Sequence, residues 1–221
     1  MFITVNGVNL HYERFGEGPA IVMCHSNCKD LTSLEKLIGV LSQKHTVYAV
    51  DSRGHGQSQV PQEFHYSDMA NDMFHFIREL NLDRPVFYGH GDGGIIGLLL
   101  ASRHPDLISK LVISGANTTP AELDGWDMRK FRRKEKRGKN DPRVSMMLRE
   151  PDISEDELKA ITVPTFITIG EFDVVNRSNS MFILNSIPNS EMYIAKFGDR
   201  NNYVLDDKAL GDVIESWLER S

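Results

Sequence analysis

Short apolar runs alternate with amphipathic stretches along almost the whole chain, and this alternation predicts the order of its secondary structure. Two runs flank Asn6-Gly7, a dipeptide that favours a tight hairpin, and predict antiparallel strands over residues 2–5 and 10–15. The later apolar runs predict strands over residues 20–24, 46–50, 86–88, 110–114, 165–169 and 191–195. The amphipathic or apolar stretches between and after them predict helices over residues 31–41, 67–80, 95–101 and 205–218.

This order of elements predicts the fold class. Short apolar strands that alternate with helices are typical of a mostly parallel sheet with helices on both faces. We therefore expect an α/β protein whose central sheet begins with the antiparallel N-terminal hairpin. In such sheets ligands bind at the carboxyl ends of the strands. We expect residues 1–221 to form one domain, with an insertion at about 117–162 between two predicted strands.

A glycine-rich stretch follows the strand predicted over residues 86–88. Residues 89–94 read Gly-His-Gly-Asp-Gly-Gly and lead into the helix predicted over 95–101. The segment therefore predicts a strand, a sharp turn and a helix. Glycine at 89 and 93 suits this turn, because side chains there would collide where the chain reverses.

Composition restricts the class of protein. The chain has 221 residues, of which 40% are hydrophobic, so it can bury a full core. Its net charge of −6 argues against general nucleic-acid binding. No apolar run approaches the roughly 20 residues of a membrane span, and residues 1–16 lack the pattern of a signal peptide, so we expect a cytoplasmic protein. Cys24 and Cys28 are expected to be reduced thiols, and neither a metal site nor a cofactor is expected.

The predicted insertion carries a strong local charge. Residues 129–139 hold eight Lys and Arg residues against Glu135, a local charge of +7, and the net charge of −6 leaves −13 for the rest of the chain. One interpretation is a solvated helix anchored by Trp126 and Phe131. The other is a basic lid that attracts an anionic ligand, an acidic partner or a membrane surface.

Three further motifs stand at the ends of predicted strands. His25-Ser26-Asn27 follows the strand 20–24, residues 51–58 read Asp-Ser-Arg-Gly-His-Gly-Gln-Ser, and residues 170–173 read Gly-Glu-Phe-Asp. Together with the turn at 89–93, these motifs occur in an order that spans nearly the whole chain. In this order they resemble the α/β-hydrolase family, especially its small esterase-like members with a short lid.

The resemblance implies a set of site residues. Enzymes of this family use a serine nucleophile at the turn, a histidine base oriented by a carboxylate, and two backbone N–H groups that bind the oxyanion. Residue by residue, the nucleophile position falls on Gly91, the acid position on Asp173 and the histidine position on Arg200. The oxyanion donors fall on the backbones of Asn27 and Asp92.

Two of the three catalytic side chains are therefore absent. Gly91 has no nucleophile, and arginine cannot replace histidine as a base because it has no lone pair to accept a proton. The last histidine of the chain is His104, which lies far before the expected loop. We expect a non-catalytic or severely impaired relative that retains a cleft above Gly91 for a small apolar or carbonyl-bearing ligand or a protein partner. Ordinary serine-hydrolase activity is predicted to be absent.

Two alternatives remain open. A weak or altered hydrolase would use activated water beside the acid, or Ser26, Cys28 or Asp92 as its nucleophile; a scaffold protein would use the basic lid. Asp92 is expected to be exposed at the start of its helix, where a negative charge is favourable. The side chains of His25 and His90 flank the expected pocket, and each is expected to hold a loop or strand end by hydrogen bonding.

Overall fold

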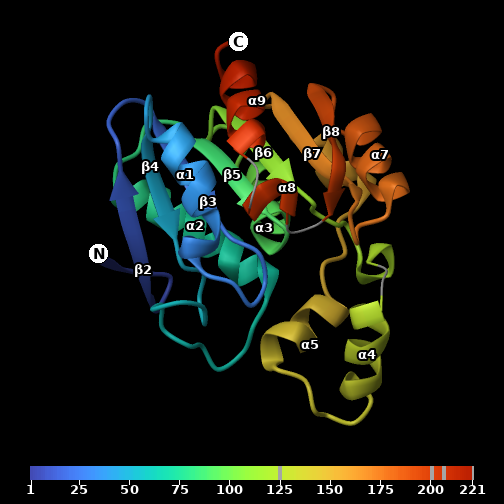
Figure 1. The fold of residues 1–221 in the computed structure, drawn as a ribbon. Coiled ribbons are helices and arrows are strands. Elements are labelled where there is room, and N and C mark those ends of the chain that lie inside the picture. The colour runs from blue at the N-terminus through green and yellow to red at the C-terminus, as the bar shows by residue number, and fades with distance from the viewer. Residues whose placement is uncertain (124–125, 200–201, 206–207, 221) are drawn as a thin grey trace.

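The computed structural model describes residues 1–123, 126–199, 202–205 and 208–220. Its centre is an eight-stranded sheet in the order β1-β2-β4-β3-β5-β6-β7-β8 (Figure 1). The strands are β1 Phe2–Val5, β2 Val8–Phe15, β3 Ala20–Cys24, β4 Thr46–Val50, β5 Val86–His90, β6 Lys110–Ser114, β7 Thr165–Phe172 and β8 Ser190–Asp199. The pairs β1–β2 and β2–β4 are antiparallel, and all the other neighbours are parallel. The predicted fold class is confirmed.

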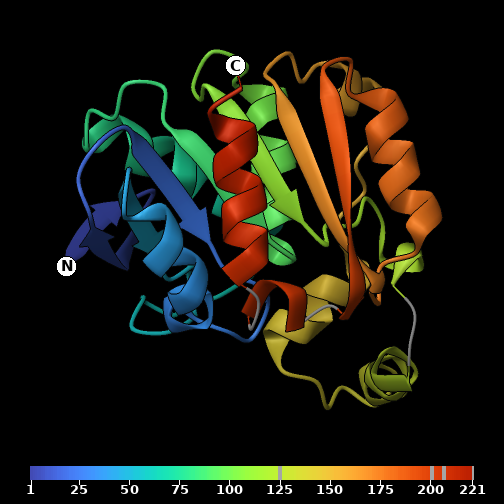
Figure 2. The ribbon, with the colours of Figure 1, turned by 45° about the horizontal axis from the view of Figure 1, so that its top comes forward.

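Helices cover both faces of the sheet (Figure 2). The helices that pack on the sheet are α1 Glu35–Leu41, α2 Tyr66–Glu79, α3 Asp92–Arg103, α7 Arg177–Ser186 and α9 Lys208–Leu218. The first part of the helix predicted over 31–41 is a 3₁₀ turn, η1 Leu31–Leu34. The helix predicted over 205–218 is described as α8 Asn202–Leu205 and α9, with residues 206–207 outside the described part.

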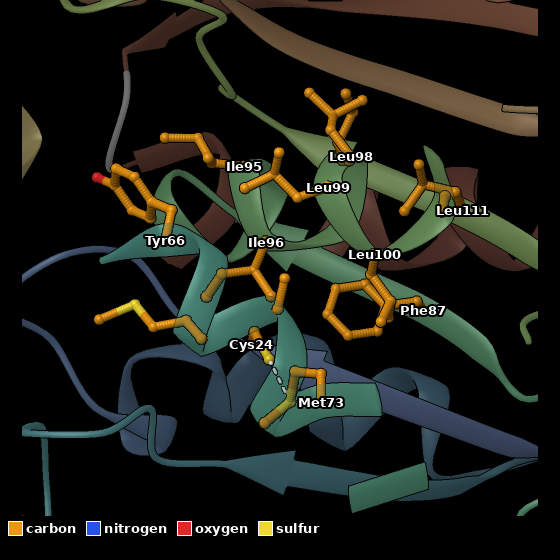
Figure 3. Close-up of a cluster of buried hydrophobic side chains, with 14 of the residues drawn as sticks. Cys24, Tyr66, Met73, Phe87, Ile95, Ile96, Leu98, Leu99, Leu100 and Leu111 are labelled. Atoms are coloured by element: carbon orange, nitrogen blue, oxygen red, sulfur yellow. Dashed lines mark hydrogen bonds between the residues drawn. The ribbon is translucent and has the colours of Figure 1, made fainter. Parts of the chain in front are cut away.

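The parallel strands are buried on both faces, which explains their continuous apolar runs. In β5, Phe87 joins the core cluster that contains α2 and α3, whereas Tyr88 joins the cluster that contains α1 and α9. Figure 3 shows the first cluster, in which α3 packs Ile96 and Leu100 toward β3, β5 and α2. Because α3 is apolar on every side, it is buried along most of its length.

The described residues of the segment between β6 and β7 form four helices. These are η2 Pro120–Glu122, α4 Trp126–Glu135, α5 Pro142–Arg149 and α6 Glu155–Lys159. A separate apolar cluster joins α4, α5 and the loop after β7, and it includes Met128, Met147 and Val175. Figures 1 and 2 show α4 standing out from the body at the end of the sheet where β7 and β8 finish. The predicted insertion thus corresponds to a helical segment at the edge where ligands bind in sheets of this type.

None of the helices in the described ranges is long and apolar enough to cross a membrane.

Candidate active site

The turn between β5 and α3 has the sharp geometry that its sequence predicts. Gly91 has φ 55° and ψ −112°, a conformation that side-chain-bearing residues rarely adopt, and α3 begins at the next residue. Its N–H donates to the carbonyl of Ser114 at 2.8 Å, so the turn is held against the end of β6.

The glycines on either side of Gly91 are required by close packing. A Cβ on Gly89 would overlap the backbone of Gly93, and a Cβ on Gly93 would overlap the carbonyl of Cys24. The turn therefore brings the start of α3 into direct contact with the end of β3.

The loop after β3 lies against this turn. The carbonyl of His25 accepts a hydrogen bond from the N–H of Gly93 at 3.1 Å, and Ser26 is buried beside it. In the ring of His25, Nδ1 donates to the Ser26 carbonyl at 2.8 Å and Nε2 accepts from the N–H of Ser52 at 3.1 Å. Burial lowers the pKa of His25, so the ring is neutral and both of its nitrogens are engaged with backbone.

A second buried histidine holds the same loop. The Nε2 atom of His55 accepts from the N–H of Cys28 at 3.1 Å, while its Nδ1 donates to the carbonyl of Arg53 at 3.0 Å. Burial, together with the nearby ring of His25, lowers the pKa of His55 to about 4. The turn that contains His55 therefore supports the shape of the loop after β3.

The rest of this turn is structural as well. Arg53 forms a bidentate ion pair with Asp72 of α2, with distances of 2.7 and 2.6 Å. The carboxylate of Asp51 accepts from the N–H groups of Leu31 at 2.8 Å and Gln57 at 3.0 Å, and it pairs with Nδ1 of His11 at 2.8 Å.

Cys28 is the candidate nucleophile whose side-chain contacts are described. The Cys28 thiol donates to the side-chain oxygen of Asn27 at 3.1 Å, and desolvation raises its pKa although the residue as a whole is exposed. A thiol with a raised pKa is a poor source of thiolate. Asp92 is 4% exposed, so its predicted exposure is wrong: the loop after β3 packs against the first turn of α3. His90 ends β5 and is buried.

Asp173 lies at the end of β7, on the side of the turn that faces β6. A Cβ on Gly115, which follows β6, would lie 3.0 Å from Oδ2 of Asp173 and 3.2 Å from the hydroxyl of Tyr203. The other carboxylate oxygen of Asp173 accepts from the N–H of Val175 at 3.2 Å. The acid position therefore lies next to the end of β6. The same end of β6 accepts the hydrogen bond from the N–H of Gly91.

Arg200 lies outside the described residues, but its flanking residues are described. The N–H of Asp199 donates to Oδ1 of Asn202, and the N–H of Asn202 donates to Oδ1 of Asp199, both at 2.8 Å. This reciprocal pair sits where β8 ends, beside the end of β7 and its Asp173.

Helix α5 contributes a residue that the sequence motifs did not indicate. The carbonyl of Arg143 accepts from the side-chain amide of Asn27 at 3.1 Å, and its guanidinium donates to the carbonyl of Gly54 at 3.2 Å. Asp141 holds the same guanidinium at 2.7 Å. The segment between β6 and β7 is thus bonded to the loop that carries the predicted oxyanion donor.

In the described part of the chain, no group of three or more His, Cys, Asp or Glu side chains could hold a metal ion.

Comparison with known proteins gives the same architecture. The family model described as alpha/beta hydrolase fold matches residues 19–216. The chain is 27% identical to the mouse (Mus musculus) protein "Serine hydrolase BPHL" over 255 residues, covering 98% of this chain and 85% of that protein.

Solved structures share the fold at low sequence identity. The enol-lactonase from Burkholderia xenovorans LB400 has a TM-score of 0.83 at 19% identity, with 100% of each chain covered. A thermophilic esterase from Thermogutta terrifontis has a TM-score of 0.81 at 18% identity, covering 100% of this chain and 98% of that chain. Because the family model runs from the start of β3 into α9, and so takes in the turn at Gly91 and both neighbouring loops, the chain belongs to the α/β-hydrolase fold family.

Proposed function

We propose that this chain is an α/β-hydrolase relative without ordinary serine-hydrolase activity, which uses the cleft above Gly91 to bind a small apolar or carbonyl-bearing ligand. The observation that carries the proposal is Gly91 itself, which takes up the strained turn between β5 and α3 with no side chain to attack a carbonyl.

The missing base supports the same conclusion. Nucleophile and base act as one unit in this chemistry, so losing either removes most of the rate. Arg200 takes the position of the base, and an arginine side chain stays protonated at neutral pH. His25 and His55, the buried histidines whose ring contacts are described near the turn, use both ring nitrogens to hold backbone groups.

The groups that would bind a carbonyl oxygen are backbone groups, and they do not depend on the lost side chains. The N–H groups of Asn27 and Asp92 are the proposed donors, and glycine at 91 leaves room for a ligand where a serine hydroxyl would stand. The backbone donors remain, whereas the nucleophile and the base are absent. A ligand would therefore bind without being turned over.

Activity is tested with an activated short-chain ester such as p-nitrophenyl butyrate, and with a fluorophosphonate probe that labels activated serines. The mouse serine hydrolase BPHL serves as the positive control. We expect turnover below about a thousandth of that of a triad esterase, and no covalent label. Ester hydrolysis at ordinary rates that survives repurification would overturn the proposal.

Binding is tested by nuclear magnetic resonance with an unreactive methyl ketone as the probe. We expect shifts at the amides of Asn27 and Asp92, and weaker binding in Gly91→Ala because its methyl group enters the cleft. The matched control is Gly39→Ala, since a methyl group there meets open space on α1. Shifts spread evenly over the surface, or equal binding by both variants, would exclude this cleft as the ligand site.

A further inference from the structure

Helix α4 and the turn after it carry an exposed cationic surface, which we call the basic face. Its members are Arg129, Arg133, Lys134, Lys136, Arg137 and Lys139, all exposed. Arg129 and Arg133 are four residues apart on α4, the spacing that places side chains on one side of a helix, and Arg137 follows in the turn after the helix. Within the described ranges, none of these six side chains enters an ion pair or a side-chain hydrogen bond.

Two carboxylates close to this surface in the described part of the chain, those of Glu135 and Asp141, are hydrogen-bonded to other groups. Glu135 accepts from the side chains of Asn140 at 2.9 Å and Ser145 at 2.6 Å, so its carboxylate is directed toward α5. Those hydrogen bonds lower the pKa of Glu135 and keep it ionised in that position. Asp141 is occupied by the guanidinium of Arg143.

The apolar side of α4 is already used for packing. Met128 is buried, and it and Phe131 contact a cluster that includes Val144 and Met147 of α5. Arg132 donates to the carbonyls of Pro120 and Leu123 at 3.0 and 3.2 Å, which fastens the helix to the segment before it. The helix is therefore oriented with the basic face away from its support.

The rest of the molecule has the opposite net charge to that of residues 129–139. Residues 129–139 carry +7, whereas the remainder of the chain carries −13. An anionic surface repels most of this protein and attracts one protruding helix, so the approach is oriented. The exposed position of α4 is visible in both ribbon views (Figures 1 and 2).

We propose that the basic face binds the surface of anionic phospholipid bilayers. A convex helix with several unpaired cations suits a plane of headgroup charges, where each Lys or Arg near the surface adds attraction without a specific docking pocket. Nucleic acid is less favoured, because single strands are held by aromatic stacking and Phe131, the aromatic residue of α4 whose side chain is described, is turned into the apolar cluster. The proposal does not depend on the proposed function of the cleft.

Binding is reversible and electrostatic. Met128 and Phe131 pack against α5, so these apolar side chains are not available for insertion into the lipid. We therefore expect association that weakens steeply as salt increases, because exposed charges are screened over about 8 Å at physiological ionic strength.

The test is sedimentation of the full chain with vesicles of phosphatidylcholine containing about 30 mol % phosphatidylserine, at low and at physiological salt. The variant Arg129→Gln, Arg133→Gln and Arg137→Gln should bind at least about tenfold more weakly. The matched control replaces three exposed arginines elsewhere, Arg78→Gln, Arg84→Gln and Arg103→Gln, with the same change in net charge. The control should bind like the native chain.

A second variant, Lys134→Gln, Lys136→Gln and Lys139→Gln, keeps the three arginines and should also bind the anionic vesicles more weakly. This variant tests the proposal if the arginine variant does not fold. Failure of the native chain to sediment with anionic vesicles at low salt would overturn the proposal. So would equal binding to pure phosphatidylcholine, or equal losses in the control. Tighter binding to a labelled single-stranded oligonucleotide than to the vesicles would assign the basic face to nucleic acid instead.

Discussion

Gly93 and Cys24 approach each other so closely that a methyl group on Gly93 would overlap the Cys24 carbonyl oxygen. The backbone there must move before any side chain fits. We predict that Gly93→Ala lowers the free energy of unfolding by about 3 kcal/mol. Gly39→Ala is the matched control, because the added methyl group meets open space on α1 and should raise stability by about 0.5–1 kcal/mol. Urea denaturation of the two variants gives both values; similar losses in both would contradict the packing argument.

The strain at residue 91 can be measured directly. A non-glycine residue at φ 55° and ψ −112° is strained, so Gly91→Ser should lower the free energy of unfolding by about 1 kcal/mol. No esterase activity is expected from this change alone, because in the proposed assignment Arg200 stands at the base position and would not activate the hydroxyl. Gly91→Ala separates the backbone effect from that of the hydroxyl. A stable and active Gly91→Ser variant would reveal a base that the present account lacks.

Restoring both missing side chains tests how the site is assigned. In Gly91→Ser with Arg200→His, Asp173 could orient the new imidazole, and ester turnover should exceed that of either single variant by at least about a hundredfold. Arg200→His alone should remain inactive. If the double variant is folded and no more active than the singles, the assignment of Arg200 or Asp173 is wrong.

The buried pair of Arg53 and Asp72 should contribute far more to stability than the partly exposed contact of Arg53 with Asp68. Asp72→Asn leaves a buried guanidinium without its main counter-charge and should cost about 3–5 kcal/mol. The Asp68 carboxylate is 42% exposed and lies 3.3 Å from the same guanidinium, so Asp68→Asn should cost less than about 1 kcal/mol. Thermal unfolding compares the two; equal losses would show that burial does not set the difference.

Acid should destabilise the fold through His55. Its folded pKa of about 4 lies below the unfolded value of 6.5, so the unfolded state binds the proton more tightly. Stability is unaffected above pH 6.5 and falls as the pH drops from 6.5 toward 4, by at most about 3 kcal/mol.

The chain also contains a histidine, His65, whose pKa is shifted in the opposite direction and whose effect on stability therefore has the opposite pH dependence. The hydrogen bond from His65 to Glu150 raises the pKa of His65, so its contribution is present at low pH and disappears as the pH rises through the folded value. His65 is 45% exposed, which keeps that contribution below about 1 kcal/mol. Unfolding free energies of the native chain and of His55→Gln at pH 7 and 5 test the prediction for His55; an unchanged loss in the variant would contradict it.

The sequence indicated most of the sheet because its strands are buried on both faces, and their apolar runs stand out from the helices. It did not indicate α7, whose buried side includes Asn179, Ser180 and Ser186. These polar residues can be buried because tertiary contacts satisfy them: Asn179 accepts from Thr118 at 2.6 Å and donates to the carbonyl of Ala116 at 3.1 Å. A hydrophobic pattern cannot reveal a helix that buries polar groups.

Some residues of the candidate site could be named from the sequence, and others could be seen only in the folded chain. Gly91 and Asp173 belong to short motifs that come after predicted strands, so local sequence was enough to name them as candidates. Arg143 and Tyr203 come to the site from α5 and α8, and only the folded chain shows that Arg143 contacts the loop of Asn27 and that Tyr203 lies near Asp173. No short motif in the sequence carries that information.

The three glycines at 89, 91 and 93 are required for different reasons. A side chain at 89 or 93 would overlap backbone atoms, so packing requires glycine at these two positions whether or not any substrate is processed. Glycine at 91 meets a different requirement, because a residue with a side chain would be strained at its positive φ. The glycine pattern around this turn therefore reports how the chain must pack, and it does not by itself report a reaction.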